Sequence, residues 1–182
     1  MENRIDGQYQ GTDSRAAIFH HPIHPVLVTF PIAFLTGALV TDLAFYASGR
    51  PFWAEASYWL LIGGIAGGTL AALPGAWDLF AIRQARRLPS AHVHGAGNVL
   101  LLGLAIANLW LRWADPAAPI NGWGLVLSAL TVDLLGITGW LGGELSYRHR
   151  IGVMEQNRVA TDGPFEDVPE PRRATAATHH AG

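Results

Sequence analysis

Four long apolar runs separated by short polar segments dominate the chain, and this pattern predicts four membrane-spanning helices. The runs cover residues of about 25–46, 56–77, 94–112 and 123–144. Each is close to the ~20 residues that a helix needs to cross the ~30 Å hydrocarbon core of a bilayer. We therefore expect an all-α fold, a polytopic membrane protein whose residues 20–153 form a four-helix transmembrane bundle.

The segments on either side of the bundle differ from it in composition. Residues 1–19 are polar, and the apolar run after them begins too late and is too long for a secretory signal peptide. Residues 154–182 are rich in Pro, Ala, Thr and charge, which is typical of a disordered tail.

Proline and glycine positions indicate how the spans begin, bend and pack. Pro25 fits the first turn of span one, where its missing N–H costs nothing, and Pro31 should kink the helix further in. Small residues recur at four-residue spacing in spans two and four, which predicts close helix packing there. The glycines concerned are Gly63, Gly64, Gly67, Gly68, Gly139 and Gly143.

Basic residues beside the spans predict the orientation of the bundle. Arginines cluster in the second loop (83–87) and after the fourth span (148–158), whereas only Arg50 and Arg112 lie near the other loops. Because cytoplasmic loops carry the excess of positive charge, both termini are predicted to be cytoplasmic. This orientation predicts an inner (cytoplasmic) membrane as the location.

Composition narrows the chemistry further. Hydrophobic residues make up 50% of the chain and charged residues only 14%, with a net charge of −2, so a nucleic-acid-binding surface is not expected. The absence of cysteine excludes disulfides and thiolate-ligated clusters. Any metal would therefore be bound by imidazole and oxygen ligands.

Several acidic and amide side chains lie well inside the spans, where such groups usually face the bundle interior and serve a function. They are Asp42, Asn98, Asn108 and Asp133. His24 and Asp42 share a helix face but are about 27 Å apart at 1.5 Å per residue, so they cannot share one small site. Asp133, near the middle of span four, is expected to hydrogen-bond Asn108 or Thr36, or to serve a proton path.

The alternating direction of four helices brings several ligand-type residues to one end of the bundle. We expect His24 and His94 to bind a cofactor, within a wider set of candidate metal ligands: His21, His24, Asp78, His94, Glu144 and His149. Two opposed imidazoles suit haem b, and imidazole with carboxylate suits Fe, Zn, Cu or Mn. Alternatively, His21 and His24 cap a helix, and Asp78 and Glu144 pair with nearby arginines.

The motifs at these positions resemble a bacterial family of four-helix membrane proteins called domain of unknown function 2231. The resemblance covers roughly residues 20–153 and rests on four motifs: His21-Pro-Ile-His24-Pro25 before Phe30-Pro31, Gly75-Ala-Trp-Asp78, His94-Gly95, and Gly142-Gly143-Glu144-Leu145-Ser-Tyr147-Arg148-His149. A glycine usually follows the last histidine of the family pattern, and here Arg150 replaces it. Some relatives are fused to a Rieske-type iron–sulfur domain, which implies an electron-transfer setting.

Three functions are compatible with these features. The first is a membrane subunit that holds a haem or metal in an electron-transfer context. The second is a non-catalytic interaction subunit that binds a redox or other membrane protein, or a second copy of itself. The third, a small transporter or proton path through Asp42, Asp78 and Asp133, has less support because no inverted repeat is evident. The sequence does not specify an enzymatic activity.

Overall fold

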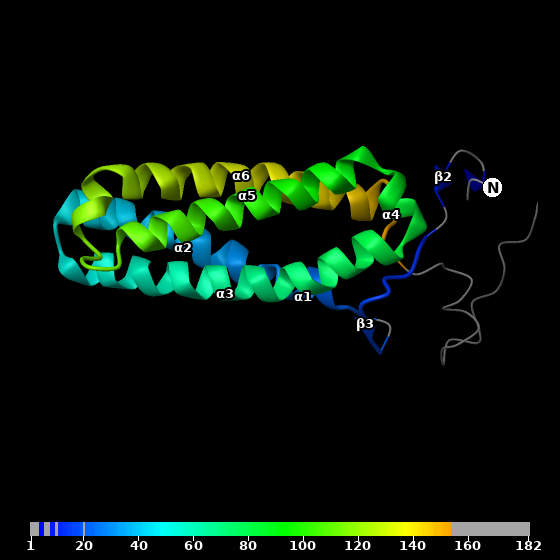
Figure 1. Cartoon of the computed structure of the whole chain (residues 1–182), viewed down its shortest axis with the longest axis horizontal. Coiled ribbons are helices and arrows are strands. Elements are labelled where there is room, and N and C mark those ends of the chain that lie inside the picture. The colour runs from blue at the N-terminus through cyan, green and yellow to red at the C-terminus, as the bar shows by residue number, and fades with distance from the viewer. Residues whose placement is uncertain (1–3, 6–7, 10, 20, 154–182) are drawn as a thin grey trace, which may run out of the picture.

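The computed structural model describes residues 4–5, 8–9, 11–19 and 21–153, and the expected C-terminal tail lies outside these residues. Four long helices lie side by side in an elongated bundle (Figure 1). The first consists of α1 (Ile23–Leu27) and α2 (Thr29–Ser48); the others are α3 (Pro51–Ala81), α5 (Pro89–Leu111) and α6 (Trp123–Tyr147). All four are long and apolar enough to span a membrane, which confirms the predicted four-helix transmembrane bundle.

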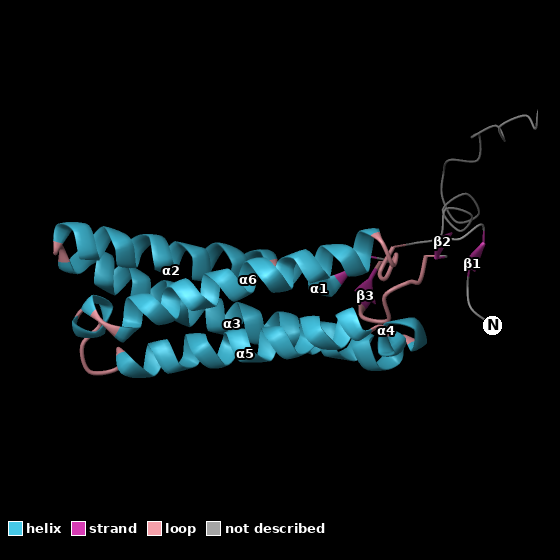
Figure 2. Cartoon of the chain, turned by 90° about the horizontal axis from the view of Figure 1, so that it is seen from above, coloured by secondary structure: helices cyan, strands magenta, loops and turns pink. Residues whose placement is uncertain are grey.

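Short elements occupy the two ends of the bundle. Helix α4 (Arg83–Arg87) joins α3 to α5, and the 3-10 helix η1 (Ala118–Asn121) precedes α6 at the opposite end. Two antiparallel pairs of two-residue strands precede the bundle: β1 (Arg4–Ile5) with β2 (Gln8–Tyr9), and β3 (Ala17–Ile18) with β4 (His21–Pro22). The N-terminal strands and α4 lie at the same end (Figures 1 and 2).

Helix ends follow the local chemistry of proline and glycine. The first helix is interrupted at Val28, three residues before Pro31, whose ring clashes with the carbonyl one turn earlier; this is the predicted distortion. Gly49 ends α2 in the left-handed conformation (φ 64°), and Pro51 starts α3. The helices extend beyond the apolar runs because polar residues at their ends continue the helical backbone. The first one starts at Ile23, so His24 lies within its first turn.

The bundle is made of two hairpins, α2–α3 and α5–α6, each with an extensive contact between its helices. The hairpins join through contacts of α3 with α5 and of α2 with α6. Helix α2 therefore lies diagonally across the bundle from α5, and α3 lies diagonally across from α6. Large apolar side chains such as Trp77, Trp110 and Trp140 point outward, as expected of a surface that faces lipid.

Glycines of α3 determine how closely α2 and α5 approach that helix. A Cβ on Gly64 would be 2.5 Å from Leu35 Cδ2, and one on Gly68 would be 2.8 Å from Leu102 Cδ2. The predicted close packing of span two is confirmed. The same prediction for span four is wrong, because a Cβ on Gly139 would meet nothing within 4 Å and one on Gly143 would meet only Tyr147 of its own helix.

Candidate functional site

Two histidines from diagonally opposed helices meet inside the bundle. His24 of α1 and His94 of α5 have ring centroids 6.2 Å apart, with their planes at 89°. Both side chains are partly buried. We call the part of the molecule around them the histidine end.

The hydrogen bonds of each ring specify where its proton lies. Nδ1 of His24 is 2.8 Å from the carbonyl oxygen of Ala71 on α3, and Nδ1 of His94 is 2.8 Å from that of Thr138 on α6. A carbonyl oxygen only accepts, so Nδ1 carries the proton in both rings. In the neutral imidazoles both Nε2 atoms therefore present lone pairs.

Glycines make room for the two rings. A Cβ on Gly75 would lie 2.7 Å from Nδ1 of His24, and a Cβ on Gly142 would lie 3.1 Å from Cε1 of His94. In each case the glycine follows, by four residues, the residue whose carbonyl accepts the histidine proton. The two histidines thus sit in equivalent environments in the two hairpins.

Asn98, one turn along α5, is a neighbour of the His94 ring. Its side-chain nitrogen donates to the backbone carbonyl of His94 at 2.8 Å and lies 3.3 Å from Nε2 of the same residue. The shorter contact is to the carbonyl. Asn98 thus keeps a hydrogen bond even when Nε2 is used by another group.

The other predicted ligands lie at the same end but are directed elsewhere. Asp78 accepts hydrogen bonds from Ser14 Oγ (2.5 Å) and from the backbone N–H groups of Arg15 (2.7 Å) and Ala16 (3.0 Å), so it anchors the N-terminal segment. Glu144 pairs with the exposed side chain of Arg148 at 3.2 Å. Asp78 thus binds the N-terminal segment and not a nearby arginine, which was the alternative suggested by the sequence. Glu144 does pair with a nearby arginine.

Two further histidines of the predicted set also belong to local structure. Nδ1 of His21 lies 2.8 Å from the carbonyl oxygen of Phe19, in the turn between β3 and β4. The backbone carbonyl of His149 accepts from Gln84, whose side-chain oxygen accepts from Thr12. Within the part of the chain that the structure describes, no three His, Asp or Glu side chains are placed to hold one metal ion. Of the proposed ligands, the structure brings together His24 and His94.

A buried ion pair lies at the other end of the bundle, which we call the ion-pair end. Arg112 donates from both terminal nitrogens to Asp42, at 2.7 Å each, and neither side chain is exposed to solvent. Its remaining N–H groups reach Asn108 Oδ1 (2.9 Å), Ser57 Oγ (2.9 Å) and Ser128 Oγ (3.4 Å). Ser128 in turn donates to Asp42 at 2.5 Å and accepts from Asn108 at 2.8 Å. All five guanidinium hydrogens are therefore used, and four helices are linked.

Sequence reasoning identified Asp42 and Asn108 but treated Arg112 only as a charge flanking a span. A usable signal was the spacing: Arg112 follows His94 by 18 residues, as Asp42 follows His24. Both the histidine pair and the ion pair thus join residues that are 70 positions apart. This equal spacing and the matching contacts between helices indicate that the two hairpins are repeats of one another.

The expected hydrogen bond of Asp133 to Asn108 or Thr36 is not formed. Asn108 is occupied by Arg112 and Ser128, and Thr36 lies exposed on α2. The side chain of Asp133 is exposed on the outer face of α6. Asp42, Asp78 and Asp133 thus lie in three separate environments, which does not support a continuous proton path through them.

These features define the class: a polytopic α-helical membrane protein, made of two repeated hairpins with paired polar residues on its central axis. The chain belongs to the family described as predicted membrane protein (DUF2231), whose sequence profile matches residues 20–155. The resemblance noted in the motifs is confirmed. No curated protein and no solved structure matches the chain. Arg150 adopts φ 53°, a left-handed conformation that glycine takes more readily than other residues.

Proposed function

We propose that the chain is a membrane subunit that holds one redox-active metal centre between Nε2 of His24 and Nε2 of His94, and that it takes part in electron transfer. The observation that carries the proposal is the pair of Nδ1–H···O=C hydrogen bonds. Histidines that ligate metals usually donate their other N–H to a carbonyl or carboxylate, which fixes the tautomer and the ring orientation. The proposed setting is the bacterial inner membrane, with the histidine end on the cytoplasmic side.

The separation of the rings supports a shared ligand. Metal–nitrogen bonds are about 2.0–2.1 Å and a ring nitrogen lies about 1 Å from its centroid, so imidazoles on opposite sides of one metal have centroids about 6 Å apart. The observed 6.2 Å agrees with this arrangement. Perpendicular ring planes are compatible with it, since each ring rotates about its own metal–nitrogen bond.

The number of ligands favours haem iron over a bare ion. A structural zinc site takes four protein ligands, whereas a haem brings four nitrogens and needs only axial ligands from the protein. The described residues offer two imidazoles there, with no third His, Asp or Glu grouped with them. When bound, such a group would supply one-electron redox chemistry, and the chain would supply binding, orientation and an apolar surrounding.

The test is an absorption spectrum with elemental analysis of the full chain purified in detergent. His24→Asn and His94→Asn are suitable variants, because the Asn amide can keep the Nδ1-type donor while removing Nε2 as a ligand. The matched control is His92→Asn, since the ring of His92 is exposed and its hydrogen bond among the described residues is to the carbonyl of Arg86. Helical content by circular dichroism checks the folding of every variant.

We expect one haem per chain, with a Soret band that falls at least tenfold in both Asn variants and persists in the His92 control. Stoichiometric metal without a Soret band, lost in the same two variants, would support the two-histidine site and reject haem. A wild-type protein that binds neither haem nor metal, including after incubation with haemin, would refute the proposal.

A further inference from the structure

Asp133 places a carboxylate in the middle of a membrane-spanning helix, facing away from the bundle. It lies 10 residues after Trp123 and 14 before Tyr147 in α6, about 15 Å and 21 Å from the two helix ends at 1.5 Å per residue. Its side chain is exposed, and it has no hydrogen bond or ion pair with the described residues. A carboxylate at this depth is costly in lipid, so such residues are usually paired.

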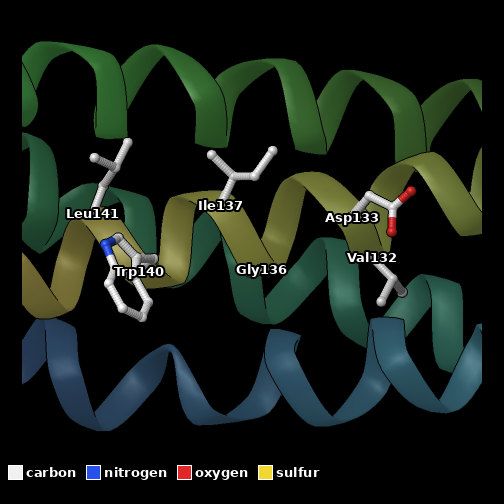
Figure 3. A pocket seen from close by; sticks show the side chains of 6 residues that line it. All are labelled: Val132, Asp133, Gly136, Ile137, Trp140 and Leu141. Carbon is white, nitrogen blue, oxygen red and sulfur yellow. The ribbon is translucent and has the colours of Figure 1, made fainter.

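The helix surface around Asp133 is shaped for close approach. An open groove runs along α6, lined by Val132, Asp133, Gly136, Ile137, Trp140 and Leu141 (Figure 3). A Cβ on Gly136, or on Gly139 beside the groove, would meet nothing within 4 Å. We call the exposed residues Asp133, Gly136, Ile137 and Trp140 the Asp133 face. Small residues let the backbones of two membrane helices approach closely.

Charge complementarity identifies the occupant of this face. Within the four described membrane helices and their caps, the arginine nearest the apolar interior is Arg112, and Asp42 and its neighbours use all its hydrogens. A second copy of the chain would place another Asp133 at the same depth. Its described spans would not supply a free cation to pair with it. Like charges facing each other are unfavourable, so a second copy does not complement this surface.

We infer that the Asp133 face docks a transmembrane helix of another protein that carries a lysine or arginine near its middle. In the complex, the basic side chain pairs with the carboxylate, and the partner helix packs over Gly136 between Ile137 and Trp140. This inference does not depend on a metal at the histidine pair, which lies inside the bundle.

The experiment measures energy transfer between the full labelled chain and a synthetic helix in phosphatidylcholine vesicles. The probes are two Leu/Ala transmembrane peptides that differ only in a central Lys or Leu. We expect the Lys peptide to associate at least tenfold more strongly than the Leu peptide. Asp133→Leu should abolish this preference and Asp133→Glu should keep it, while Gly136→Leu should weaken association by blocking close approach.

A relocated carboxylate is the matched control. The variant Asp133→Leu/Val40→Asp moves the acid to an exposed position of α2, about as far from the ion-pair end as Asp133. If it binds the Lys peptide as strongly as the wild type does, any carboxylate suffices and the inference is overturned. It is also overturned if the two peptides bind wild type equally, or if wild-type chains self-associate through Asp133.

Discussion

Neutralising Asp42 tests whether the buried ion pair holds the two hairpins together. Asp42→Asn preserves the shape of the side chain but replaces Oδ2, which accepts from Arg112 and from Ser128, with a donor. The Arg112 charge then remains fully buried without a counter-charge. Removing one partner of a buried pair leaves the other charge uncompensated, which typically costs about 3–5 kcal/mol.

This loss corresponds to a change of about two to four orders of magnitude in the unfolding equilibrium, since 1.4 kcal/mol is tenfold. It can be measured by titrating the protein in dodecyl maltoside with sodium dodecyl sulfate and following helicity by circular dichroism. Glu144→Gln is the control, because its partner Arg148 is 77% exposed and such pairs contribute at most about 1 kcal/mol.

The exchange variant Asp42→Arg/Arg112→Asp tests whether positions 42 and 112 are equivalent in the two hairpins. Because the two positions are equivalent in the two hairpins, the pair should re-form with reversed polarity and recover at least half of the loss. Recovery should be incomplete, since Ala38 stands 70 residues before Asn108 and offers no side-chain acceptor. The reasoning fails if Asp42→Asn costs no more than Glu144→Gln, or if the exchange is less stable than Asp42→Asn.

Three further predictions concern the anchor, the helix packing and the histidine pair. Asp78→Asn should speed hydrogen exchange at the two backbone amides that it binds by about tenfold or more, because bonds to a charged acceptor contribute about 1.5–3 kcal/mol; unchanged exchange would contradict the anchoring role. Gly64→Ala should destabilise the bundle by about 1–3 kcal/mol through overpacking. Gly103→Ala, with open space around it, should be neutral or stabilising. Equal effects of the two variants in the detergent titration would contradict the packing argument. Asn98→Ala should leave metal or haem affinity unchanged or raise it up to about tenfold in a competition titration, and a marked loss would mean that Asn98 supports the ligand directly.

The fold was predictable from the sequence because a bilayer imposes one strong constraint. Every backbone polar group within the hydrocarbon must be paired internally, so each long apolar run becomes a helix. The interruption before Pro31 followed from the steric clash of the proline ring with the preceding turn. Packing partners were less predictable, since the spacing of Gly64 and Gly68 resembles that of Gly139 and Gly143, yet only the first pair packs against neighbouring helices.

The depth of the site residues along the bundle was predictable from the sequence, but the direction of their side chains was not. Counting helices placed His24, Asp78, His94 and Glu144 at one end, and all four lie there. Which side chains meet depends on the rotation of each helix about its axis, and Asp78 and Glu144 turn to other partners. Arg112 was missed for a related reason: at the end of a span it resembles an interfacial charge, and only the diagonal contact with Asp42 shows that it is buried.

The ion pair and the histidine pair differ in whether their two residues can bond each other directly. This difference supports the proposal of a metal between the histidines. At the ion-pair end the repeated positions hold unlike residues, Asp42 and Arg112, which satisfy each other directly. At the histidine end the equivalent positions hold identical residues, whose Nδ1 protons are both used by carbonyls. Two Nε2 lone pairs cannot bond each other, but both can donate to one metal. Identical residues at the histidine end and complementary residues at the ion-pair end therefore fit the proposal that only the histidines share a ligand.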